Sequence, residues 1–262
     1  GLKLHTKGKT MMATYTLISS DSHIIEPADL WETRIDCTFR DRAPRLVHEG
    51  EFDQWYADGV KFGNIGTNQQ AGLRFEAPDK LTAGGSMNTI PLGGVDPHAH
   101  VKDMDIDGVA GGVLYPSQGL TVYRVPDSAL LSAIFRAYND WLADFCKPYP
   151  NRLKGIAMLN VDEPTVAAME LRRAANIGLA GAMIPLRPME HRYDHPMYEP
   201  LWAAAERQAV TAATFFWVGS ETDWHGVGAR YRVAPFDAKI GEAVKVAQIL
   251  AWLDLPARER PR

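Results

Sequence analysis

Apolar residues along the chain occur in short runs that alternate with longer amphipathic stretches. The runs at 109–115 and 153–159 are almost wholly apolar, which is typical of parallel strands covered on both faces. Between them, apolar residues recur with a 3.6-residue period, which predicts a helix that begins near Asp127 or Ser128 and stops at Pro148. This alternation predicts a βαβ architecture, either a (β/α) barrel or an open doubly wound sheet.

The same pattern predicts the other elements. A first strand ends at the polar residues 19–23, and Asp162 is expected to cap a helix that has Pro164 in its first turn and ends at Gly178. No Gly-x-Gly-x-x-Gly follows the first strand and no P-loop is present, so a dinucleotide-binding fold has no support. We expect about five parallel strands in all, the last three elements being a strand at Leu179–Leu186, a helix at Leu201–Gln208 and a strand at Val210–Val218.

The segment 27–107 interrupts this rhythm. It is rich in turn-forming residues and has no long helical period, although pieces such as 45–48 and 60–62 alternate and predict a small hairpin. A long irregular insertion in a compact domain is usually functional. We therefore expect 27–107 to form a lid over a site.

Composition narrows the class of protein. The 262 residues are 46% hydrophobic and 23% charged, with a net charge of −4. These values are ordinary for a globular protein and predict neither a nucleic-acid partner nor a membrane partner. Cys37 and Cys146 do not suggest a disulfide framework, so we expect a cytoplasmic protein. Residues 1–12 are expected to be an extension outside the fold.

The strongest chemical signal is the pair Asp21 and His23 at the end of the first strand. Residues two apart in a strand point to the same face, so a carboxylate oxygen and an imidazole nitrogen should converge there. Such a pair is half of a catalytic divalent-metal site. Alone, Asp-x-His equally fits a turn-capping aspartate and a packed histidine.

Several motifs together resemble the amidohydrolase-related metal-dependent hydrolases, also called the amidohydrolase 2 family, a group that includes the aminocarboxymuconate-semialdehyde decarboxylase-like enzymes. The resemblance covers roughly residues 15–208. It implies a TIM-like barrel with one divalent metal, zinc or else manganese, at the C-terminal ends of the strands, with Asp21 and His23 as ligands. The motifs that carry it are 18–23 with Glu26-Pro27 and Leu30-Trp31, 40–45, 102–109, 114–117, 137–142 and 198–206.

The resemblance breaks near residue 208. The family has a ligating histidine at the fifth strand, where this sequence has Trp217, and an indole N–H offers no lone pair to a metal. Only 44 residues follow Val218, whereas three further strand–helix units need about 90. We therefore expect a truncated or frame-shifted member, with a partial barrel at 13–220, a divergent segment at 221–262 and an amphipathic helix at Ile240–Leu253. Such an open barrel should be unstable or associate into homo-oligomers.

Other residues have weaker signals. His98 and His100 form a His-x-His pair, for which a surface role or a supporting role is the better interpretation. His191 and His195 fit a solvated loop, and His225 is the last histidine of the chain. Arg187 follows the fourth strand and could hold a substrate carboxylate, or pair with a neighbouring glutamate.

The leading hypothesis is a metal-dependent hydrolase that acts on a small carboxylated or aromatic molecule through a metal-activated water. Two alternatives remain: a non-oxidative decarboxylase of the same family, and a non-catalytic remnant without a complete metal site. The sequence does not identify a catalytic acid or base.

Overall fold

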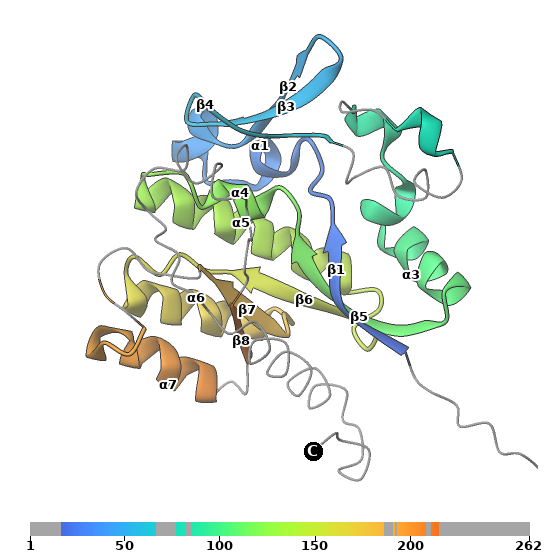
Figure 1. Ribbon diagram of the computed structural model, residues 1–262. Coiled ribbons are helices and arrows are strands. Elements are labelled where there is room, and N and C mark those ends of the chain that lie inside the picture. The colour runs from blue at the N-terminus through green and yellow to red at the C-terminus, as the bar shows by residue number, and fades with distance from the viewer. Residues whose placement is uncertain are drawn as a thin grey trace, which may run out of the picture.

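Five parallel strands form the main sheet in the order in which they occur along the chain, β1-β5-β6-β7-β8 (Figure 1). The computed structural model describes residues 17–66, 77–81, 85–185, 191 and 193–207, and the backbone of 211–214. Each neighbouring pair of strands is parallel, which confirms the predicted fold class of an incomplete (β/α) barrel. The strands are β1 Leu17–Ile24, β5 Val109–Pro116, β6 Leu153–Met158, β7 Gly181–Ile184 and β8 Thr211–Thr214.

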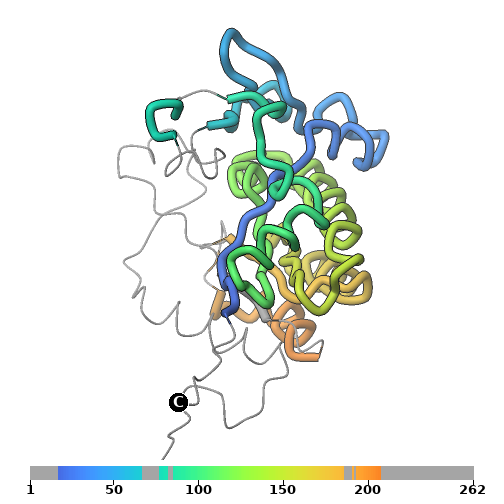
Figure 2. The backbone as a smooth tube through the Cα atoms, turned by 90° about the vertical axis from the view of Figure 1, so that its right-hand side faces the viewer, coloured from blue at the N-terminus to red at the C-terminus, as the bar shows by residue number. Residues whose placement is uncertain are grey.

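Helices connect the parallel strands and stack along one side of the sheet (Figure 2). This arrangement is that of consecutive βαβ units in a barrel wall. The α-helices are α1 Leu30–Arg34, α3 Pro97–Ile106, α4 Gly119–Val122, α5 Ser128–Cys146, α6 Pro164–Asn176 and α7 Glu199–Arg207. The 3₁₀ helices are η1 Cys37–Arg42, η3 Pro78–Lys80, η4 Met87–Thr89, η5 Leu92–Gly94 and η6 Pro196–Tyr198.

Helix α5 is the centre of the core. Asp127 caps it, since its Oδ1 accepts hydrogen bonds from the amides of Ala129 and Leu130. The predicted apolar stripe is buried, and so is Asn139, whose side chain bonds both backbone groups of Met158 in β6. A polar side chain is tolerated there because its hydrogen bonds are made within the protein.

The start of α6 differs from the prediction. Glu163, not Asp162, is the N-cap residue, and its side chain makes no capping hydrogen bond. Pro164 in the first turn supplies the helical φ angle instead, because proline needs no amide partner at that position. The predicted end is confirmed: Gly178 has φ +99°, a left-handed conformation that favours glycine.

The insertion contains an antiparallel sheet with β3 in the middle, formed by β2 Arg45–Glu49, β3 Phe52–Ala57 and β4 Val60–Asn64. The turn at Asp58-Gly59 has φ values of 51° and 74°, as a tight hairpin requires. The sequence predicted the two outer strands but not β3. Three consecutive residues of β3, Asp53 to Trp55, are buried, so this strand lacks the alternating pattern by which the outer strands were found. Arg42 joins this insertion to the barrel by bonding Asp58 and the helix cap Asp127.

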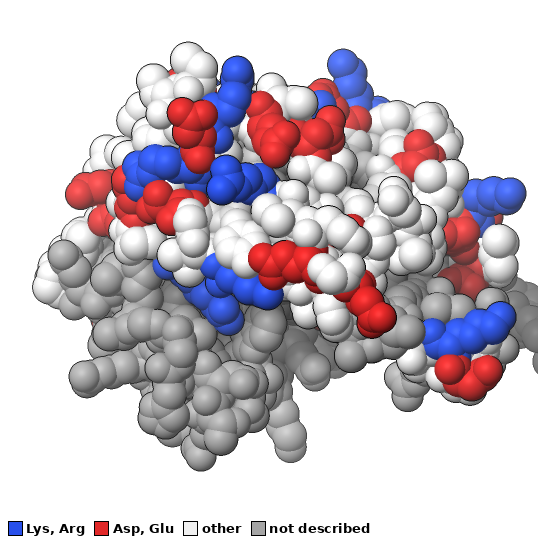
Figure 3. All heavy atoms as spheres, turned by 90° about the horizontal axis from the view of Figure 1, so that it is seen from above, with Lys and Arg blue, Asp and Glu red and all other residues white. Residues whose placement is uncertain are grey.

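Acidic and basic side chains are mixed over the face seen from above (Figure 3), so this face has no strongly basic patch. Among the described residues, no helix is long and apolar enough to cross a membrane. The expectations for Trp217, His225, Val218 and the helix Ile240–Leu253 lie outside the described residues.

Candidate metal site

Asp21 and His23 lie near the C-terminal end of β1, where the structure brings their side chains together. The distance from His23 Nε2 to Asp21 Oδ1 is 3.6 Å. The β1–β5 register shifts between Ser19 and Ser22, so β1 has one extra residue at this point. Such bulges re-aim side chains and are common next to active sites.

A backbone carbonyl orients the His23 ring. His23 Nδ1 lies 2.7 Å from the carbonyl oxygen of Pro116, at the end of β5. A carbonyl only accepts, so Nδ1 carries the proton in this bond and Nε2 of the neutral ring carries a lone pair. A histidine that binds a metal through one ring nitrogen typically donates the N–H of its other ring nitrogen to a carbonyl or carboxylate.

The two donor atoms fit two positions of one metal ion. Two donors that each lie about 2.1 Å from a tetrahedral ion are separated by about 3.4 Å. The observed separation of 3.6 Å is close to that value. Both side chains are partly exposed, 35% for His23 and 52% for Asp21, so an ion could reach them.

The charges around the pair favour a cation. Burial lowers the pKa of His23, but the Asp21 carboxylate, the Pro116 carbonyl and the Glu26 carboxylate outweigh it and leave the pKa above its ordinary value. Tyr115 is buried, with its ring centroid 6.1 Å from that of His23. Burial and the charge of Asp21 raise the pKa of Tyr115, so this phenol stays neutral.

Glu26 is a fully buried carboxylate close to this pair in the sequence. Its Oε2 accepts the amide of Gln118 at 2.9 Å, and its Oε1 accepts the amide of Gly119 at 2.8 Å. Burial raises the pKa of Glu26, and these two hydrogen bonds oppose the rise. The sequence contained this residue in a family motif but gave it no role, since backbone partners leave no trace in a sequence.

A third ligand is not found in the part of the chain that the structure describes. No group of three or more His, Cys, Asp or Glu side chains there could hold a metal ion. His98 bonds the Tyr149 hydroxyl at 2.9 Å, and His100 bonds the Gly93 carbonyl at 2.8 Å, in agreement with supporting roles. Arg187, the predicted substrate-binding residue, lies outside the described residues.

His191 and His195 follow β7, and their rings stack with centroids 4.2 Å apart. His195 is the N-cap residue of η6, and its Nδ1 accepts a hydrogen bond from the amide of Met197. This contact explains His195 as a local capping residue. Neither contact connects the two histidines to Asp21 or His23.

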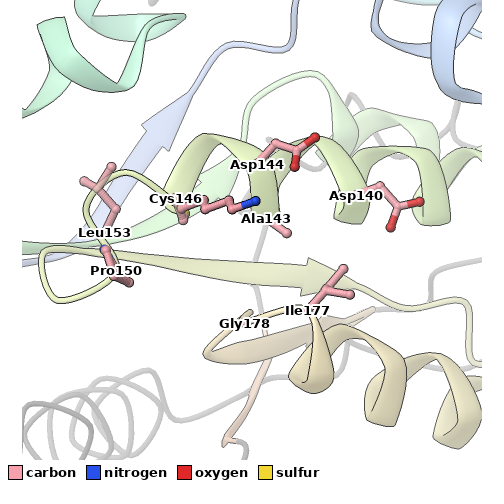
Figure 4. A pocket seen from close by; sticks show the side chains of 9 residues that line it. Asp140, Ala143, Asp144, Cys146, Pro150, Leu153, Ile177 and Gly178 are labelled. Carbon is pink, nitrogen blue, oxygen red and sulfur yellow. The ribbon is translucent and has the colours of Figure 1, made fainter.

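A groove of about 540 Å³ lies at the other end of the strands (Figure 4). It is lined by the end of α5, the start of β6 and the end of α6, including Cys146, Lys147 and Gly178. Two of its carboxylates are already paired, Asp144 with Arg34 and Asp140 with Arg173. Sites in this class of barrel form at the C-terminal ends of the strands, so we assign no role to the groove.

One solved structure has a similar fold. An amidohydrolase from Mycobacterium avium subsp. paratuberculosis superposes with a TM-score of 0.62 at 15% identity, covering 92% of this chain and 70% of that one. The described region therefore shares the fold of an incomplete (β/α) barrel with that protein.

Curated proteins of similar sequence include decarboxylases. The chain is 35% identical over 104 residues to gamma-resorcylate decarboxylase of Rhodococcus jostii, which is 34% of this chain and 30% of that enzyme. The predicted resemblance to the amidohydrolase-related family is thus confirmed. The chain spans about a third of the length of the curated decarboxylases that it matches.

A second resemblance covers the C-terminal third. Residues 175–262 match the type I phosphodiesterase / nucleotide pyrophosphatase family. An uncharacterised pyrophosphatase/phosphodiesterase of Schizosaccharomyces pombe is 42% identical over 65 residues, 24% of this chain and 13% of that protein. A displaced reading frame would not produce such matches, so they argue against the frame-shift interpretation of the sequence after residue 208.

Proposed function

We propose that this chain derives from a metal-dependent decarboxylase of the amidohydrolase-related family, with Asp21 and His23 as ligands of a divalent ion, zinc or manganese. The observation that carries the proposal is the convergence of Asp21 Oδ1 and His23 Nε2 at 3.6 Å, with the His23 ring held by the Pro116 carbonyl. Decarboxylation is preferred over the hydrolysis that the sequence favoured, because the relatives from the amidohydrolase-related family are gamma-resorcylate decarboxylases.

The substrate class that we propose is a small aromatic acid. In the overall reaction the bond from the ring carbon to the carboxylate breaks, carbon dioxide leaves, and a proton takes its place on the ring. A bound divalent ion supplies Lewis-acid polarisation of a substrate oxygen. Asp21 and His23 would hold that ion, and Arg187 would pair with a substrate carboxylate.

The test combines metal analysis with turnover. Purified chain is loaded with Zn²⁺ or Mn²⁺, its metal content is measured, and release of carbon dioxide from gamma-resorcylate is followed. Metal at about one equivalent and turnover that both disappear in Asp21→Ala would support the proposal. Metal without turnover would leave a binding site and reject the decarboxylase.

A second candidate is a non-catalytic chain. Two observations favour it: only two candidate ligands come together among the described residues, and residues 175–262 match a second enzyme family. In this interpretation, the fifth-strand ligand is missing because the sequence after residue 208 no longer follows the amidohydrolase-related family. Absence of metal from chain purified in the presence of Zn²⁺ would favour this candidate.

A further inference from the structure

The loop that follows β5 is bonded to β1 at both of its ends. At its start, the Pro116 carbonyl accepts the His23 ring N–H. At its end, the amides of Gln118 and Gly119 donate to the two oxygens of Glu26. Both ends of the segment 116–119 are thus bonded to side chains that lie three residues apart, at 23 and 26.

We propose that Glu26 is a positioning residue: its carboxylate fixes the loop 116–119, and through the Pro116 carbonyl it sets the orientation and tautomer of the His23 ring. This inference deepens the proposed function. Its metal-affinity test depends on the proposed metal site, whereas its NMR test does not. Pro116 is two residues from Gln118, so a displaced amide end of this loop would displace the carbonyl that His23 needs.

The chemistry of the contact requires a carboxylate. Both partners of Glu26 are N–H donors, so both oxygens must accept, and a carboxylate has two acceptor oxygens. A glutamine of the same shape has one, and its amino group would face a backbone N–H. Burial of a charge is costly unless hydrogen bonds satisfy it, and here each oxygen has one.

The same contacts favour a positioning role for Glu26 over a role in proton transfer. A general acid or base must reach a substrate atom, whereas Glu26 is 0% exposed. Its two oxygens face the loop backbone. It therefore acts through the loop and His23.

Gly119 shows how tightly the loop is packed. A Cβ at this position would lie 2.7 Å from Met158 Sδ, 2.8 Å from Pro116 Cβ and 3.1 Å from Glu26 Oε1. Only glycine fits without movement of these groups. Gly119→Ala is therefore a second way to displace the loop, and it keeps the Glu26 carboxylate in the sequence.

The experiment measures His23 directly in the metal-free chain. Heteronuclear NMR of the imidazole nitrogens, above the pKa of the ring, reports the tautomer, and the His23 signals are assigned by their loss in His23→Asn. We expect the Nδ1–H tautomer in the unmodified chain and a mixture of tautomers in Glu26→Gln and Gly119→Ala. Amide hydrogen exchange at Gln118 and Gly119 should be faster in Glu26→Gln. The control is Leu171→Ala, a buried residue of α6 away from this loop, which should destabilise the fold but leave the tautomer unchanged.

Metal affinity is the second measurement. Zn²⁺ affinity is measured by competition with a chromogenic chelator. It should fall by roughly 10- to 100-fold in Glu26→Gln, which is the usual effect of losing a group that supports a metal ligand, and it should be unchanged in Leu171→Ala. An unchanged tautomer in both folded loop variants, or an equal change in Leu171→Ala, would overturn the inference. If the unmodified chain binds no Zn²⁺, the proposed function fails, while the NMR result still decides the role of Glu26.

Discussion

Two buried polar side chains, Asn139 and Glu26, each bond backbone atoms of a neighbouring segment, and they differ in charge and in position. Asn139 lies in the middle of the core and bonds Met158 in β6. Glu26 lies at the edge of the sheet and bonds the loop after β5. The neutral amide matches one N–H and one carbonyl, whereas the carboxylate matches two N–H groups.

The comparison separates stability from function. A neutral amide satisfies a strand at little electrostatic cost, and this is sufficient for a structural contact. A buried carboxylate is more costly and is retained beside the two candidate metal ligands. We interpret Asn139 as a residue of the fold and Glu26 as a residue of the site.

The largest effect is expected at the ligands themselves. His23→Ala or Asp21→Ala should weaken Zn²⁺ binding by more than the roughly 10- to 100-fold that loss of a supporting group costs, because a donor atom is removed. The measurement is chelator competition at fixed pH. Asp21 is 52% exposed, so chemical denaturation of metal-free Asp21→Ala should give nearly unchanged stability. His23→Ala also removes the partner of the Pro116 carbonyl and should be modestly less stable. Full metal affinity in both variants would rule out the site.

Asn139→Ala should have the opposite profile. It leaves the buried N–H and carbonyl of Met158 without their side-chain partners, so the free energy of unfolding should fall by about 2–4 kcal/mol. Urea denaturation measures this loss. Zn²⁺ affinity of the folded variant should be unchanged, and a large drop would show that the core and the site are not separable.

Arg42→Ala tests the connection between the insertion and α5. Arg42 holds the pKa of Asp58 below its ordinary value, and the Leu130 amide together with Arg42 does the same for Asp127. A lowered folded-state pKa contributes stability above the unfolded pKa of about 4, and this contribution is lost as the pH falls through the folded value. We therefore expect a small fall in Tm at neutral pH.

The pH dependence supplies the control for this variant. The difference in Tm between Arg42→Ala and the unmodified chain should shrink as the pH is lowered below about 4, because both partner carboxylates become protonated. Thermal unfolding over a series of acidic buffers measures it. A difference that stays constant with pH would mean that Arg42 acts through packing of its side chain rather than through charge.

The smallest effect is expected for Arg34→Ala. Arg34 pairs with Asp144 at 2.7 Å on the rim of the groove, and the two side chains are 36% and 61% exposed. Exposed pairs contribute about 0–1 kcal/mol, so stability and metal affinity should both change little. A large loss of stability on urea denaturation would show that this ion pair contributes more to the fold than its exposure indicates.

Local patterns in the sequence were sufficient for the parallel sheet. The apolar runs and the period of α5 identify elements through their own residues, and Asp127 and Gly178 mark the helix ends through local backbone chemistry. The pair Asp21 and His23 was also visible, since the strand period of two places both on one face.

Only the tertiary structure revealed what holds that pair. The partners of His23 and Glu26 are backbone atoms about 90 residues away, at Pro116, Gln118 and Gly119. A backbone carbonyl or amide has the same chemistry at almost every position, so no residue type marks it in a sequence. The sequence therefore determined which elements form and which side chains could bind a metal. The fold alone decided which backbone groups come within reach of them, because that depends on the register of β1 against β5.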